Sequence, residues 1–232
     1  PAFEASYQAG MRGYETDIRM TKDGEMVASH DATLARLTPC TREVESMTTD
    51  EIRKVRTFKG NKIVFLSELV DYLADKDSMY VEFEMKTTDP VGFYNPQVLK
   101  DYCNKLYDIT MRKKPVHSLY LFTSSDKNAL KTMRSLHPDA ELLLIMSKPV
   151  NDETILTAID MGIKRIGCML QGTSKSAVDL AHKAGLSVSL WPTASVEEFM
   201  LGAYLGADAL CCDRAVAVKN FLDTKATWIK YK

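Results

Sequence analysis

Apolar and polar positions follow two different periods at the start of the chain. Residues 2–10 (AFEASYQAG) place Phe3 and Tyr7 one helical turn apart, which predicts a helix that ends at Gly10. The next stretch, YETDIR (14–19), alternates as a strand does. A TKDG turn then leads into EMVASH, and this order predicts a short β-hairpin.

Helical and strand patterns alternate from there to the end of the chain. Predicted helices cover residues 49–55, 66–75, 96–108, 126–136, 151–161, 173–184, 195–205 and a last segment from about 214. Predicted strands cover residues 78–86, 118–123, 141–146, 164–169, 187–191 and 207–212, which with 14–19 makes seven main strands. Repeated strand–helix units indicate a parallel sheet with right-handed crossovers, and its closed form at about 250 residues is the TIM (β/α)8 barrel.

The pattern holds one main strand fewer than an eight-stranded barrel needs. An unclosed barrel would expose two apolar strand edges, which full closure removes. Because the first predicted element is a helix, we expect barrel strand one to lie upstream of Pro1. A genuine seven-stranded variant is the alternative. The 232 residues have an ordinary globular composition and are predicted to form a single barrel domain, 1–232.

Charge and hydropathy narrow the function classes. Thirty basic and thirty-one acidic side chains give a net charge of −1, so no global field recruits nucleic acid or an anionic membrane. No apolar run approaches the ~18 residues of a membrane span, and no transmembrane segment is expected. Any phosphate site must therefore be built locally, and the expected partner is a small molecule. The sequence does not indicate an oligomeric state.

The cysteines bear on the compartment. They form an odd set with no C-x-x-C spacing, which favours buried free thiols over a disulfide framework or a structural zinc site. The five are Cys40, Cys103, Cys168, Cys211 and Cys212. Free thiols favour a reducing cytoplasm. An exported form stays open, because the chain starts at Pro1 without a methionine and a signal could precede it.

Two predicted strands each carry paired acidic residues. Side chains two residues apart in a strand share a face, so Glu15 projects with Asp17, and Glu82 projects with Glu84 and Lys86. If both pairs point into the mouth of a barrel, burying them without a counter-charge would be costly. Three carboxylates with several waters suit Mg²⁺ or Ca²⁺, since hard cations take oxygen ligands.

The alternative for the first acidic pair is a solvated outer face, with Tyr14 and Ile18 turned inward. The pair His30-Asp31 favours the metal interpretation. It closes the hairpin that follows this strand, and it brings an imidazole that titrates near neutrality back toward the strand end.

Several short motifs together carry a resemblance. PAFEASYQAG followed by YETDIRMTKDGEMVASHD resembles the glycerophosphodiester phosphodiesterase family, which has a helix of this kind, an E-x-D strand, a T-K-D-G turn and an H-D pair. FLSELVDYL, EMK, TSSD, WPTA and LGADALCCDR are similar to later motifs of the family. The similarity covers nearly the whole chain, and the combination is specific although each piece alone is weak.

The resemblance implies roles for individual positions. Carried over residue by residue, it implies a catalytic acid/base, His30, and two substrate-binding residues, Lys86 and Trp191. It implies three metal ligands, Glu15, Asp17 and Glu84, which would hold Mg²⁺ or Ca²⁺ as the cofactor. Glu82 is the second candidate for the third ligand, and we expect it instead to be a deeper layer-forming or salt-bridging residue.

One departure from the family pattern concerns histidine. The family's His-Arg-Gly motif, which supplies a second catalytic histidine and a phosphate-binding arginine, has no counterpart in these 232 residues. His117, His137 and His182 do not replace it, because active residues of barrels lie at the C-terminal strand ends and these three do not.

The implied activity is metal-dependent hydrolysis of glycerophosphodiesters to sn-glycerol 3-phosphate and an alcohol. Two alternatives stay open: a phospholipase D-like lyase that stops at a cyclic phosphate, and a non-catalytic phosphodiester-binding barrel. The loop TTDPVGFYNP (87–96) offers Phe93 and Tyr94 either as walls of a substrate site or as loop packing.

Overall fold

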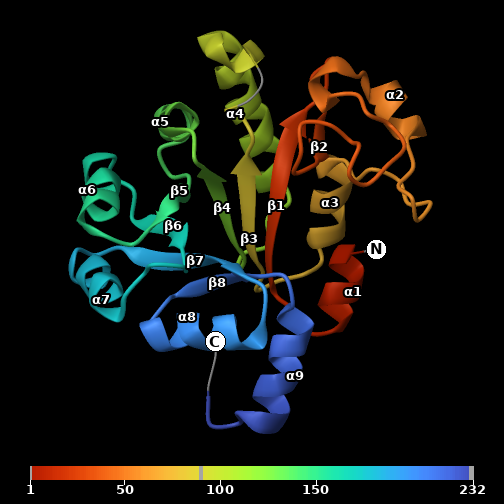
Figure 1. The fold of residues 1–232 in the computed structure, drawn as a ribbon. Coiled ribbons are helices and arrows are strands. Elements are labelled where there is room, and N and C mark those ends of the chain that lie inside the picture. Colours follow the sequence, from red (N-terminus) through yellow and green to blue (C-terminus); the bar gives the residue numbers. More distant parts are fainter. Residues whose placement is uncertain (1, 89–90, 230–232) are drawn as a thin grey trace. The chain divides into compact units, whose positions relative to one another are not determined.

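The computed structural model describes residues 2–88 and 91–229, shown as a ribbon in Figure 1. The chain separates into two compact units. The first unit is Gly13–Glu141, and the second unit joins Pro1–Arg12 to Leu142–Lys232. The prediction of a single domain over 1–232 and the prediction of a strand upstream of Pro1 both stay predictions.

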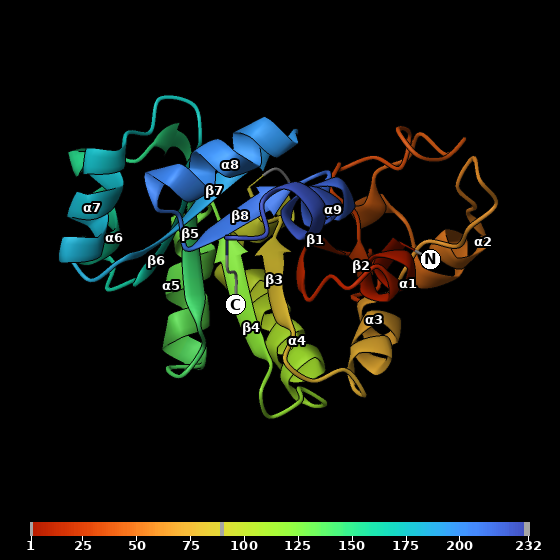
Figure 2. The same cartoon turned by 90° about the horizontal axis from the view of Figure 1, so that it is seen from below.

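The first unit carries the hairpin and two further parallel strands. Its strands are β1 (Gly13–Met20), β2 (Met26–Ala28), β3 (Tyr80–Met85) and β4 (Leu119–Ser124). Strand β1 pairs with β2 antiparallel and with β3 parallel, and β3 pairs with β4 parallel. Its helical elements are η1 (Val44–Ser46), α2 (Thr49–Lys54), α3 (Leu66–Leu73), η2 (Val91–Tyr94), α4 (Pro96–Met111) and α5 (Lys127–Leu136). Helix α4 lies beside β3 and β4 (Figure 2).

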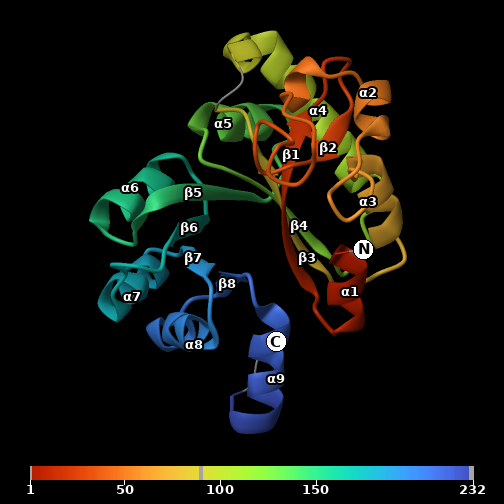
Figure 3. The same cartoon turned by 45° about the vertical axis from the view of Figure 1, so that its right-hand side comes forward.

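The second unit is a run of parallel strands and helices. Its strands are β5 (Leu142–Pro149), β6 (Arg165–Met169), β7 (Ser187–Thr193) and β8 (Ala209–Cys212), paired in that order. Its helices are α1 (Ala2–Gln8), α6 (Asp152–Asp160), α7 (Lys175–Lys183), α8 (Val196–Leu205) and α9 (Ala215–Lys225). Figure 3 shows α6, α7 and α8 following these strands in turn.

The structure confirms the predicted elements and adjusts their ends. The seven predicted main strands are β1 and β3 to β8, and every predicted helix is present. Strand β5 runs to Pro149 instead of stopping at 146, because its pairing with β6 resumes at Pro149 after an irregularity. Helix starts follow the caps that the sequence offers: the Asn95 side chain accepts from Gln97 N–H ahead of Pro96, and Thr48 forms a capping box ahead of α2.

The two faces of β3 explain its sequence. Val81, Phe83 and Met85 are buried, and the Phe83 ring packs edge-on against Tyr120 of β4 with centroids 5.4 Å apart. The alternate residues of β3 are the glutamates. Apolar burial on one face therefore fixes the register that presents the carboxylates on the other.

None of the helices formed by the described residues has the length and apolarity that a membrane crossing requires.

Tyr102 of α4 ties the helix layer to the strand that carries the acidic pair. Its side chain is fully buried, and its hydroxyl donates to the Ile18 carbonyl oxygen of β1 at 2.8 Å. Burial, helped by the nearby Cys103, raises the pKa of Tyr102 well above its usual value, so the hydroxyl stays a donor. The same carbonyl also accepts from the Lys86 N–H at 3.3 Å.

Tyr102→Phe should lower the free energy of unfolding by about 1 kcal/mol, the ordinary net value of one hydrogen bond. The loss stays near this value because the Ile18 carbonyl keeps its second donor. Urea unfolding of the variant measures it. Tyr94→Phe, which removes a hydroxyl from a side chain that is 77% exposed, is the matched control and should change stability by less than about 0.5 kcal/mol.

Candidate active site

Parallel pairing of β1 with β3 brings the acidic residues of both strands together. Asp17 lies opposite Glu84, and Glu15 lies opposite Glu82. One carboxylate oxygen from each of Glu15, Asp17 and Glu84 can be chosen so that all three lie within 4.8 Å of one another. We call these three residues the carboxylate triad. They stand on one face of the two strands, as the spacing of two residues predicts.

Lys86 lies within the carboxylate triad. Its Nζ is 2.9 Å from Asp17 Oδ1 and 2.6 Å from Glu84 Oε1. Burial alone would lower the pKa of Lys86, but hydrogen bonds to Glu84 and Asp17 outweigh it and raise the pKa above its ordinary value. The ammonium therefore stays charged and neutralises part of the negative charge, but one cation faces three carboxylates.

The negative charge that Lys86 does not neutralise affects the pKa of Glu15. Loss of hydration, followed by repulsion from Asp17, Glu84 and Glu82, raises it to about 8, and Lys86 opposes the shift. Solvent still reaches the side chain, but three neighbouring carboxylates give this direction by themselves. Burial also raises the pKa of Glu84, against the lowering effect of its hydrogen bond from Lys86. At neutral pH the site holds a proton where a cation could bind.

Glu82 has a different environment from the triad. Its side chain is 9% exposed, and its Oε1 accepts from the Tyr80 hydroxyl at 2.5 Å. It lies opposite Glu15, one pleat before Glu84 along β3. The position is the deeper one, and the contact with Tyr80 gives its carboxylate a protein partner of its own.

His30 follows β2 and is tied to β1 through its neighbour. The Ser29 N–H donates to the Asp17 carbonyl oxygen at 3.0 Å, which brings the segment after β2 to the strand that carries the acidic pair. His30 Nδ1 lies 2.7 Å from Asp31 Oδ1, and Arg36 Nε donates to Asp31 Oδ2 at 2.5 Å. With its Nδ1–H donated to Asp31, the neutral imidazole presents Nε2 for proton transfer.

Asp31 is held as an anion by these contacts. The hydrogen bond from Arg36, then the one from His30, lower the pKa of Asp31 to about 2. The chain Arg36–Asp31–His30 thus orients an imidazole that is itself 63% exposed.

Three further candidates from the sequence are Trp191, Phe93 and Tyr94. Trp191 belongs to the second unit, where its carbonyl oxygen accepts from the Leu170 N–H at 2.8 Å, and its role as a substrate wall stays a prediction. Phe93 is buried and packs edge-on against Tyr102 with centroids 5.0 Å apart, so it is loop packing. Tyr94 is exposed. Residues 89–90 of the same loop lie outside the described residues.

The three remaining histidines have ordinary partners. His137 stacks on Tyr107 with ring centroids 3.7 Å apart. His182 Nε2 lies 2.9 Å from Asp208 Oδ2, and His117 Nε2 lies 3.9 Å from Asp77 Oδ2.

Sequence reasoning missed three residues around the site. Arg36 follows Asp31 in a loop, where no periodic pattern marks it. Thr123 of β4 lies opposite Glu84, and its buried Oγ1 has no hydrogen-bond partner among the described residues. Arg19 shares the strand face of Glu15 and Asp17, and this spacing of two was the signal that could have found it.

Comparison with known proteins decides the family. The profile of the glycerophosphoryl diester phosphodiesterase family matches residues 1–217. The chain belongs to this family. A glycerophosphodiester phosphodiesterase of Caldanaerobacter subterraneus is 34% identical over 93 residues, which are 37% of this chain and 38% of that protein. The chain therefore aligns with well under half the length of this relative. A Mycobacterium tuberculosis protein named "Probable glycerophosphodiester phosphodiesterase 2" is 23% identical over 98% of this chain and 85% of its own length.

Solved structures of phosphodiesterases share the fold of this chain. A phosphodiesterase of Oleispira antarctica, solved in complex with its product sn-glycerol 3-phosphate, aligns with a TM-score of 0.85 at 16% identity, over 96% of this chain and 90% of that one. The glycerophosphodiester phosphodiesterase of Thermotoga maritima aligns with a TM-score of 0.71 at 19% identity, over 97% and 90%. The predicted TIM-barrel fold class is thereby confirmed.

The donor set of the triad fits a hard divalent cation. All three groups offer carboxylate oxygens, which Mg²⁺ and Ca²⁺ prefer, and their spacing lets one ion contact all of them. The proton that Glu15 retains to about pH 8 is what such an ion would displace.

The raised pKa of Glu15 predicts how the stability of the metal-free protein depends on pH. The unfolded chain ionises this group near its ordinary value of 4.5, whereas the folded protein keeps it protonated to about 8. Between these values the folded state binds more protons, so stability falls as pH rises through the window. In the presence of chelator the melting temperature of the wild type should decrease from pH 5.5 to pH 8.

Glu15→Gln should flatten this dependence, because the variant has no carboxyl to ionise at position 15. Mg²⁺ or Ca²⁺ should raise the melting temperature of the wild type more at pH 8 than at pH 5.5, and of the variant much less. Thermal unfolding followed by circular dichroism measures both effects. Glu43→Gln, at the exposed cap of η1, is the control for losing a carboxyl elsewhere. An identical pH profile for wild type and Glu15→Gln would contradict the assignment.

Proposed function

We propose that this protein hydrolyses glycerophosphodiesters to sn-glycerol 3-phosphate and an alcohol, with a divalent cation, Mg²⁺ or Ca²⁺, held by Glu15, Asp17 and Glu84. The observation that carries the proposal is the convergence of these three carboxylates with Lys86 on adjacent parallel strands of a chain that belongs to this family. The relative from Oleispira antarctica, solved with sn-glycerol 3-phosphate as its product, supports the choice of product.

The chemistry explains why such a site suits a phosphodiester. The negative charge of the diester repels nucleophiles, so catalysis requires positive charge at the phosphoryl oxygens. A bound divalent cation supplies that charge and lowers the pKa of an attacking hydroxyl. Lys86 adds a charged donor held between Asp17 and Glu84, where it can bind a phosphoryl oxygen without losing its counter-ions.

His30 handles the proton. Asp31 accepts a hydrogen bond from Nδ1–H, so Nε2 is the atom that takes a proton from an attacking hydroxyl or returns one to a leaving alkoxide. Side-chain exposure of 63% lets a substrate reach it. Trp191 is proposed as an apolar wall for the substrate, on the resemblance of its WPTA segment to the family motif.

The partner is a small-molecule diester, and the free thiols support a reducing cytoplasm as the compartment. Two alternative functions can be distinguished by analysing what the protein releases from the diester. A lyase of the phospholipase D-like kind would accumulate a cyclic phosphate, which phosphorus NMR distinguishes from sn-glycerol 3-phosphate. A binding module would retain the diester without turnover.

The central test is release of sn-glycerol 3-phosphate from glycerophosphocholine, measured with a coupled dehydrogenase. Chelator should abolish release, and Mg²⁺ or Ca²⁺ should restore it. Glu15→Gln and Glu84→Gln should each lower kcat/KM by at least about 10²-fold, because each removes a carboxylate that would hold the cation, and the cation is what offsets the negative charge of the phosphoryl group. Activity that survives both chelation and Glu15→Gln would remove the proposal. Glu153→Gln, on the exposed start of α6, is the matched control.

His30→Asn tests proton transfer. It should slow hydrolysis of an alkyl diester by about 10²- to 10⁴-fold, the usual contribution of one general acid or base. The loss should be smaller for a p-nitrophenyl diester, because nitrophenolate leaves without protonation. An equal loss for both substrates would show that His30 does not protonate the leaving group. His137→Asn, whose ring packs on Tyr107, is the control.

A further inference from the structure

Arg19 is the largest fully buried side chain among the described residues, although it carries a charge. It lies near the end of β1, two residues after Asp17 and on the same strand face. A buried guanidinium is retained only where its donors are matched. The partners of Arg19 therefore indicate what it does.

Those partners join two segments to β1. Nε and Nη2 of Arg19 both donate to the backbone carbonyl oxygen of His30, at 3.3 Å and 3.1 Å. Nη1 donates to Oε1 of Glu45 in η1 at 2.9 Å. The planar guanidinium thus donates twice to one carbonyl oxygen and also pairs with the Glu45 carboxylate, a geometry that a lysine ammonium does not reproduce.

The described contacts of His30 are hydrogen bonds at its backbone and at Nδ1. It lies beyond the last residue of β2, and its side chain is 63% exposed, so packing does not hold the imidazole. The backbone is instead held on either side of the residue: the Ser29 N–H donates to the Asp17 carbonyl oxygen, and Arg19 grips the carbonyl of His30 itself. The contact with Asp31 then sets the rotation of the ring.

We propose that Arg19 is a positioning residue for His30. Arg19 lies on β1, the strand that carries Glu15 and Asp17, and its hydrogen bonds to the His30 carbonyl oxygen fix the backbone of His30 relative to that strand. The proposal rests on the proposed function, in which His30 transfers the proton. A shift of about 1 Å in a reacting group costs about 10²-fold in rate, so a clamp on this carbonyl should be visible in kcat.

The competing explanation is that Arg19 only neutralises Glu45 and stabilises the loop around η1. The two explanations differ in what happens when both charges are removed. Arg19→Met leaves Glu45 without this counter-charge and removes the clamp. The double variant Arg19→Met with Glu45→Met also removes the clamp, but it removes the Glu45 carboxylate together with its counter-charge. The stability of the double variant should therefore be closer to that of the wild type than the stability of the single variant is. His30 should remain mispositioned in both variants.

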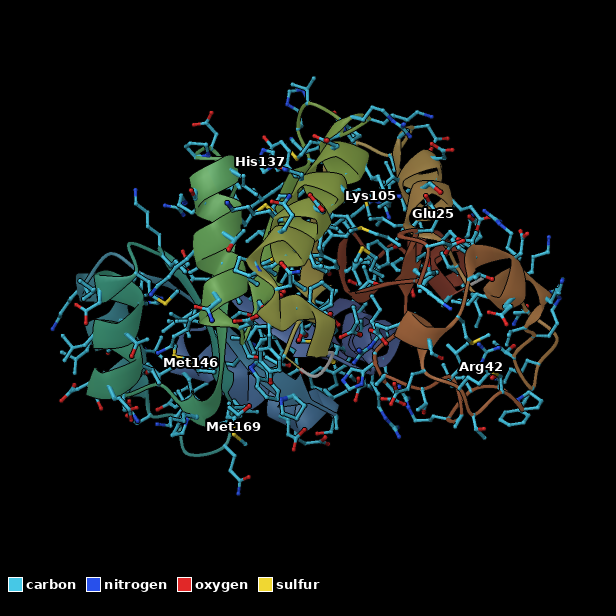
Figure 4. All side chains as sticks on the ribbon, turned by 90° about the horizontal axis from the view of Figure 1, so that it is seen from above. Glu25, Arg42, Lys105, His137, Met146 and Met169 are labelled. Atoms are coloured by element: carbon cyan, nitrogen blue, oxygen red, sulfur yellow. The ribbon has the colours of Figure 1, made fainter. Side chains whose placement is uncertain are left out.

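The experiment compares the wild type, the single variant and the double variant with saturating divalent cation. We expect kcat for glycerophosphocholine to fall about 10²-fold in both variants with KM changed less than about threefold, and the melting temperature of the double variant to lie closer to that of the wild type. Lys105→Met, which breaks the ion pair between Lys105 and Glu25 labelled in Figure 4, is the matched control and should keep the wild-type kcat. Recovery of kcat together with stability in the double variant would overturn the proposal.

A second readout does not depend on turnover. In nitrogen-15 NMR of the metal-free protein, His30 should give one set of ring signals with the Nδ1 proton in place, assigned by its loss in His30→Asn. Those signals should broaden or shift in both Arg19 variants while the signals of His137 stay unchanged. Unchanged His30 signals in the double variant would contradict the proposal. If the wild type releases no sn-glycerol 3-phosphate, the proposed function fails, and the ring signals alone decide the role of Arg19.

Discussion

Repulsion among carboxylates across the β1–β3 pair is the constraint on which the rest of the site depends. The parallel register sets Asp17 against Glu84 and Glu15 against Glu82, and Lys86 places one positive charge between Asp17 and Glu84. Hydrogen bonding along both strands and the buried apolar face of β3 oppose separation of the two strands. The charges are thus held together by contacts that they do not themselves supply.

The repulsion among the carboxylates appears as a proton that Glu15 retains above its ordinary pKa. Glu15 keeps its proton to about pH 8 because ionisation would add a negative charge beside the others. The carboxylates repel one another when no cation is present, and a hard cation would relieve that repulsion. Relief of the repulsion would therefore add to the free energy of cation binding. Lys86 reduces the penalty without removing it, which leaves the fold stable and the triad still attractive to a cation.

The proton-transfer group is built on a different principle. The triad stands on two paired strands, whereas His30 stands on a segment beyond β2 and depends on discrete hydrogen bonds, donated by Ser29 N–H and by Arg19 and accepted by Asp31. Strand pairing fixes the triad through many cooperative contacts. The position of a loop residue depends instead on the few hydrogen bonds that hold it. The buried guanidinium of Arg19 joins the two parts, because it starts on the strand of Asp17 and ends on the backbone of His30.

The sequence by itself determined the order of strands and helices, since each element shows its own period and its own cap. It also determined that Glu15 and Asp17 share a face of their strand, and that Glu84 and Lys86 share a face of theirs, because side chains alternate in any strand. The motif resemblance named the same residues and His30. Which strand lies beside which, and in which register, was decided by tertiary structure, because pairing between β1 and β3 joins residues more than sixty positions apart. The Arg19 clamp, the contact of Arg36 with Asp31 and the packing of Phe93 on Tyr102 likewise arise from contacts between distant or irregular segments, for which no local period exists.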